Sequence, residues 1–131
     1  MSRYLARLKH NAKVMNKTFK KREKALVAAL TRACETAKSW DSGFLWLTHT
    51  VRHNDFPDSL VITCVFSLDA ELVAVKEQGI DKKLCVLIQK QMNDSGLVVK
   101  NVQRHMRMDS EESCLREDAG NWEKRLNKQR L

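Results

Sequence analysis

The chain is poor in the residues from which nucleotide-binding loops are built. It has 131 residues and only four glycines, and loops that cradle phosphates are hard to build with so few of them. Walker loops, dinucleotide fingerprints, Gly-x-Ser-x-Gly elbows and zinc-ligand spacings are missing from it. An enzyme is therefore the weaker class of function. We predict no catalytic residues, no cofactor and no metal ion.

Long apolar runs and paired cysteines are missing as well. No apolar run approaches the ~20 residues that span a bilayer, and the N-terminus lacks the apolar segment of a signal peptide. The four cysteines, Cys34, Cys64, Cys85 and Cys114, are far apart and form no C-x-x-C pair. We interpret them as reduced thiols, and we expect a cytoplasmic protein without membrane association.

What the chain does have is an uneven distribution of positive charge. The first 24 residues hold nine of the 24 Lys and Arg and one of the 16 Asp and Glu, which gives +8. The remaining 15 positive and 15 negative residues cancel. A basic segment on a neutral body is typical of a protein that binds a polyanion. We therefore divide the chain into a basic amphipathic arm, 1–24, and a single α+β domain with a polar C-terminal tail, 25–131.

Apolar residues in the arm recur every three or four positions and continue into the domain. The stripe comprises Leu5, Leu8, Ala12, Met15, Phe19, Leu26, Ala29 and Ala33, and Arg22 is the one break in its spacing. This spacing predicts an amphipathic helix that can join a stronger helix from about 20 to 38. Three interpretations of the arm stay open at this point: it binds nucleic acid, it lies on an anionic membrane, or it is a solvated or self-packed segment.

The rest of the chain alternates between strand and helix signals. Residues 44–51 and 60–66 predict two strands of a hairpin, separated by a polar loop with Asn, Asp and Pro. Helices are predicted from Asp69 and from Asp81, the second ending near Gly96, and 97–108 predicts a third strand. The expected fold is α+β: a small three-stranded antiparallel or mixed sheet, helices packed on one face, and a long N-terminal helix.

Basic residues in the arm and in the third predicted strand are the candidate nucleic-acid contacts. Lysine and arginine neutralise phosphates and release counterions, which drives binding that depends little on sequence. In the predicted strand, alternation places Lys100 and Arg104 on one face. The candidate primary contacts are Arg3, Arg7, Lys9, Lys13, Lys17, Lys20, Lys21 and Arg22, and the secondary ones are Lys100, Arg104 and Arg107.

Two other groups of polar residues have ordinary explanations. His49 and His53 have a spacing that binds metal on a helix, but on a strand and its loop we do not expect them to converge. Asp109, Glu111 and Glu112 form an acidic group that we interpret as a solvated loop. An alternative hypothesis is that this acidic loop pairs with the basic arm and holds it in an autoinhibited position.

Several stretches resemble a small family of uncharacterised gamma-proteobacterial proteins, some of them labelled Fis-family transcriptional regulators. The resemblance lies in residues 43–49, 55–60, 107–114 and 120–122 and covers about 25–126. It implies a bacterial cytosolic protein and supplies no catalytic residues. A Fis-type helix-turn-helix is not expected, because 109–119 is too polar for the supporting helix.

The order of elements also resembles the KH-like domain of ribosome-binding factor A, although the Gly-x-x-Gly loop of ordinary KH domains is absent. Together these patterns predict a non-enzymatic, nucleic-acid-associated protein that prefers RNA or the ribosome over DNA. The alternative is a protein-interaction or self-associating module that uses the amphipathic stripe across residues 5–33.

Overall fold

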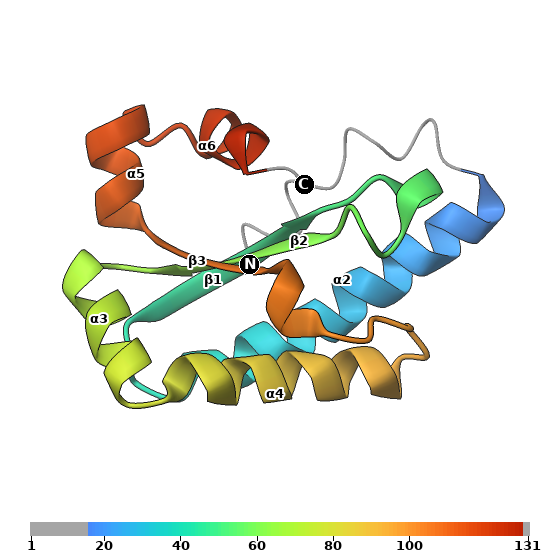
Figure 1. Ribbon diagram of the computed structural model, residues 1–131, viewed down its shortest axis with the longest axis horizontal. Helices are drawn as coiled ribbons and strands as arrows, with labels where there is room; N and C mark the ends of the chain where they lie inside the picture. The colour runs from blue at the N-terminus through green and yellow to red at the C-terminus, as the bar shows by residue number, and fades with distance from the viewer. Residues whose placement is uncertain (1–15, 130–131) are drawn as a thin grey trace.

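The structure is a computed structural model that describes residues 16–129 (Figure 1). Those residues form a mixed three-stranded sheet with helices on both of its faces. The α+β class and the long N-terminal helix are confirmed. The elements are α2 (Lys17–Lys38), β1 (Phe44–Thr50), η2 (His53–Asp55), β2 (Val61–Phe66), α3 (Asp69–Glu77), α4 (Ile80–Asp94), η3 (Val102–His105), β3 (Met106–Ser110), α5 (Glu111–Asp118) and α6 (Trp122–Lys128).

The sheet has the order β1-β2-β3, with β2 at its centre. β1 and β2 pair antiparallel as the predicted hairpin, for example through His49 and Ile62, and β3 runs parallel to β2. Every residue of β2 is buried, as its nearly continuous apolar sequence predicts for a strand covered on both faces. The hairpin loop, 51–60, contains η2 and lies beside the N-terminal half of α2 (Figure 1).

One face of the sheet is covered by α2 and α4, which form the expected helical layer. Leu26, Leu30 and Ala33 of α2 are fully buried there, together with Ile88 of α4. α2 begins at the Asn16 cap, whose side chain accepts a hydrogen bond from the backbone N–H of Phe19. The helix then runs without interruption past residue 24, so the expected boundary between arm and domain lies inside a continuous helix.

A second, smaller layer covers part of the opposite face and is formed by the C-terminal stretch described above as a polar tail. Trp46 of β1 and Val65 of β2 are buried there against Trp122 and Leu126 of α6. The indole rings of Trp46 and Trp122 pack edge to face with centroids 4.9 Å apart. The C-terminal stretch is therefore folded through residue 128. Figure 1 shows α5 and α6 on the side of the sheet away from α4.

The third strand is shorter than predicted, because only 106–110 pairs with β2. The segment before it is irregular and ends in η3. The Gln89 side chain of α4 forms hydrogen bonds with the backbone of this segment. It accepts one from the Val102 N–H and donates one to the Val99 carbonyl. Lys100 and Arg104 consequently do not share a strand face, and that part of the prediction is wrong.

None of the helices within residues 16–129 is long and apolar enough to cross a membrane.

Candidate nucleic-acid interface

Four lysines form a row on the outer face of the first two turns of α2. Lys17, Lys20, Lys21 and Lys24 are all exposed. They stand at positions i, i+3, i+4 and i+7, so they share one side of the helix over about 10 Å of its length. No acidic side chain among residues 16–129 forms an ion pair with any of them. We call these four residues the lysine ridge.

Three ridge residues were predicted as phosphate contacts, and Lys24 was not. Its place in the ridge follows from the same helical spacing, since it lies seven residues after Lys17 and four after Lys20. The signal was therefore present in the sequence once the helix was assumed to be continuous. Arg3, Arg7, Lys9 and Lys13 lie outside the described residues.

Arg22 faces the hairpin loop and not the ridge. Its Nη1 donates a hydrogen bond to the His53 carbonyl over 2.9 Å, and its guanidinium lies 4.4 Å from the centroid of the Phe56 ring. The Phe19 ring stacks on the His53 imidazole from the same side of the helix, with centroids 5.7 Å apart. Arg22 therefore already has partners within the domain, although it was predicted to contact phosphates.

Glu23, one position further, joins the same loop through two histidines. His53 Nε2 lies 2.8 Å from Oε1 of Glu23, and His49 Nε2 lies 3.1 Å from both carboxylate oxygens. All three side chains are largely buried, with exposed fractions of 1% for His49, 6% for His53 and 14% for Glu23. The two imidazoles were not expected to converge, and they do so because α2 places a carboxylate between them.

Burial raises the pKa of the Glu23 carboxyl, but the hydrogen bonds and charge interactions with His49 and His53 outweigh it. The net result is a pKa below the ordinary value. Arg22 Nη1 also lies 3.4 Å from His53 Nδ1, so both ring nitrogens of His53 have polar neighbours within the domain. A metal ion would need the His53 Nε2 lone pair, and within 16–129 no three side chains are arranged to hold one.

The second predicted basic group is dispersed over a loop and the start of a strand. Lys100 and Arg104 are exposed, one in the irregular segment and one in η3. Arg107 is partly buried and donates hydrogen bonds to the carbonyls of Arg104 and Met106. His105 Nδ1 lies 2.8 Å from the Leu60 carbonyl. Lys100 and Arg104 therefore remain available for a ligand, whereas Arg107 is engaged locally.

The acidic group near the end of β3 holds the C-terminal layer in place. Arg125 contacts Asp109 through two nitrogens, at 2.6 and 2.9 Å, and Asp118 through a third at 2.9 Å. A hydrogen bond from Lys128 is the main cause that lowers the pKa of Asp118. Glu111 accepts a hydrogen bond from the Trp122 indole. This group is therefore paired within the domain, and the idea of a freely solvated acidic loop is wrong.

α5 and α6 together have the layout of a helix-turn-helix, with residues 119–121 as the turn. Residues 111–118 form α5 despite the polarity of 109–119, and Cys114 and Asp118 of this helix are buried. Residues 111–128 nevertheless carry five acidic against four basic side chains, a net charge of −1. Duplex binding depends on positive charge, and this helix pair has no net positive charge.

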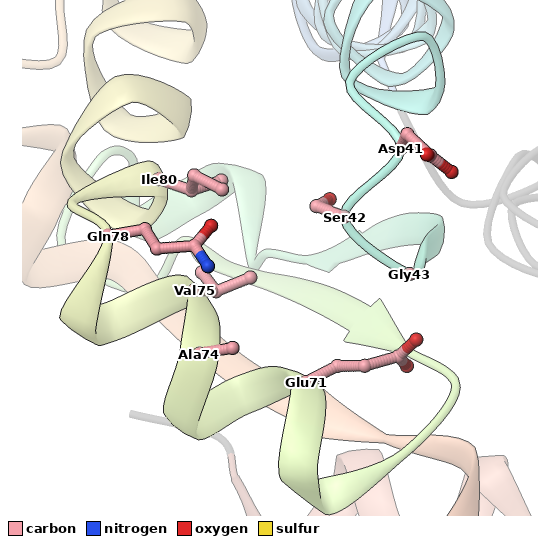
Figure 2. A pocket seen from close by; sticks show the side chains of 8 residues that line it. All are labelled: Asp41, Ser42, Gly43, Glu71, Ala74, Val75, Gln78 and Ile80. Carbon is pink, nitrogen blue, oxygen red and sulfur yellow. The ribbon is translucent and has the colours of Figure 1, made fainter.

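A pocket of about 340 Å³ lies between the α2–β1 loop and α3. Figure 2 shows Ser42 across the pocket from Val75, Gln78 and Ile80, with the Glu71 carboxylate directed toward Gly43. Its charged lining residues, Asp41 and Glu71, are acidic. The pocket therefore does not suit a polyanion and is separate from the lysine ridge.

Comparison of the chain with models of protein families, with curated proteins and with solved structures found no match. The resemblances described above therefore stay predictions.

Proposed function

We propose that this is a non-enzymatic, nucleic-acid-associated protein that prefers RNA and binds phosphates through its basic N-terminal segment. The observation that carries the proposal is the lysine ridge: four exposed lysines on one face of an ordered helix. The opposite face of that helix is docked on the hairpin loop through Arg22 and Glu23. The positive row is therefore directed away from the protein.

The ridge suits a ligand recognised by its backbone charge. Four ammonium groups within about 10 Å can each neutralise a phosphate and release its counterion. The loop between α4 and η3, which carries Lys100, lies toward the same end of the molecule as the start of α2 (Figure 1). We therefore assign Lys100 and Arg104 to secondary contacts. RNA is favoured over DNA by the order of the elements and by the acidic character of the α5–α6 pair.

The test compares the full chain with a variant in which the four ridge lysines are replaced by Gln. Binding of a mixed-sequence single-stranded RNA and of a duplex DNA is measured by fluorescence anisotropy between about 50 and about 200 mM salt. Each lost phosphate contact on a single strand lowers the slope of log K against log salt by about 0.7. The variant should therefore bind more weakly, with a slope smaller by up to about 2.8.

A matched control removes the same charge from four exposed lysines elsewhere, Lys38, Lys76, Lys82 and Lys124. If the ridge is the binding surface, the control should keep most of the salt slope of the unmodified protein. Equal losses in the two variants would mean that net charge alone governs binding. Unchanged affinity in the ridge variant would overturn the proposal.

Part of the surface predicted for a self-associating module is buried inside the folded domain. Leu26, Ala29 and Ala33 of the stripe are buried in the protein's own core against the sheet and α4. They cannot pair with a partner helix while the domain is folded.

A further inference from the structure

We propose that Glu23 is the positioning residue of the lysine ridge: by binding His49 and His53, it fixes the first turns of α2 and presents the four lysines as one rigid row. This inference rests on the proposed function, and it identifies the residue that holds the binding surface in place. The Glu23 side chain itself is largely buried against the two histidines and need not contact the ligand.

The start of α2 needs such a contact because the arrangement of charge in its first two turns opposes helix formation. Lysines at i, i+3, i+4 and i+7 repel one another along the ridge. The first turn contains no acidic residue, so positive side chains stand at the positive end of the helix dipole. The local features that favour the helix here are the Asn16 cap and the i,i+3 contact of the Arg22 guanidinium with the Phe19 ring, 5.5 Å from its centroid. The segment would fray if only local interactions held it.

Contacts with the β1–β2 hairpin stabilise the first turns of α2 where local interactions do not. The Glu23 carboxylate lies 2.8 Å from His53 Nε2 and 3.1 Å from His49 Nε2, and the three side chains are largely buried. Arg22 adds its hydrogen bond to the His53 carbonyl and its contact with the Phe56 ring. We call these residues, Arg22, Glu23, His49, His53 and Phe56, the clamp. The clamp joins the outer end of α2 to the tip of the β1–β2 hairpin.

The proposal makes a prediction opposite in sign to a purely electrostatic one. Glu23→Gln removes a negative charge close to the ridge, so charge alone would leave RNA binding unchanged or make it tighter. Gln has one acceptor oxygen in place of a carboxylate and cannot serve both imidazoles in the same way. If the clamp positions the ridge, E23Q should instead weaken binding, by about three- to tenfold, because the lysines must be ordered on binding.

Glu35 supplies the matched control. It is exposed on the same helix, and Glu35→Gln makes the same change in charge without touching the clamp. The affinity of both variants for the single-stranded RNA is measured as above, and amide hydrogen exchange of residues 17–24 is followed in the free proteins. We expect faster exchange and weaker binding in E23Q, and neither change in E35Q.

If E23Q binds the RNA as tightly as the unmodified protein or more tightly, the positioning role is overturned. This holds even if amide hydrogen exchange of residues 17–24 becomes faster. If circular dichroism shows that E23Q does not fold, Glu23→Asp decides instead. Asp keeps the charge but is one methylene shorter, so the same weakening is expected and unchanged affinity again overturns the inference. Loss of binding in the ridge variant without loss in E23Q rejects the clamp alone, whereas a ridge variant that binds normally rejects the proposed function itself.

Discussion

Replacement of Trp122 by Ala should destabilise the whole domain, although the residue lies in a stretch whose sequence looks like a polar tail. Its side chain is 3% exposed, packs edge to face against Trp46, and donates a hydrogen bond to Glu111. Truncation of a buried tryptophan costs about 3–5 kcal/mol. For a domain of this size that corresponds to a melting temperature lower by about 10–20 °C.

The measurement is thermal unfolding followed by circular dichroism. A single transition is expected in both proteins, because Trp122 contacts residues of β1 and belongs to the same buried cluster as Val65 of β2. Leu115→Ala on the exposed side of α5 is the control, since 68% exposure predicts a change within about 0.5 kcal/mol. If the Trp122 variant melts within about 3 °C of the unmodified protein, the second layer does not contribute to the fold as the structure indicates.

Two further predictions concern Glu23 and Gly43. The folded-state pKa of Glu23 lies below its ordinary value of 4.5, so its ionised form stabilises the fold above that pH and the contribution is lost as pH falls through the lower value. The free energy of unfolding, measured with urea at decreasing pH, should therefore fall more steeply in the unmodified protein than in E23Q. Parallel curves of this free energy against pH would contradict the reasoning. Gly43 has φ +88°, and a Cβ there would collide with the Glu71 carboxylate. Gly43→Ala should lower the free energy of unfolding by about 1–2 kcal/mol because of the left-handed backbone alone. In a double-mutant cycle measured by urea unfolding, Glu71→Ala should recover only the additional loss that the collision causes.

The class of fold, the hairpin and the long helix were predictable because each depends on local patterns. The nearly continuous apolar run of β2 predicted a strand buried on both faces, and the spacing of Leu26, Ala29 and Ala33 predicted the buried face of α2. The basic row was predictable for the same reason, because lysines three and four apart share a face wherever the helix is continuous.

The rest depends on contacts between residues far apart in the chain. Val98 is 72% exposed while Leu97 and Val99 are buried, an alternation that imitates a strand. The backbone partner there is the Gln89 side chain, which no local pattern reveals. The ionic contacts that hold the C-terminal layer could not be predicted, because Asp109 and Asp118 are buried as partners of Arg125 and sequence patterns count such residues as solvated.

The convergence of His49 and His53 was also outside the reach of local reasoning. Their spacing along a strand and a loop carries no information about a third residue on another element. Glu23 precedes His49 by 26 residues and meets it only because α2 packs along the hairpin.

The clamp also constrains how this chain can diverge in evolution. Surface loops between paired strands ordinarily tolerate insertions and deletions. Here the β1–β2 loop places His53 and Phe56 against α2, so a change in its length would displace both from Arg22 and Glu23. Homologues with a longer or shorter hairpin should therefore show linked replacements at positions 22, 23 and 49, whereas homologues that keep the loop length should keep the acid at 23.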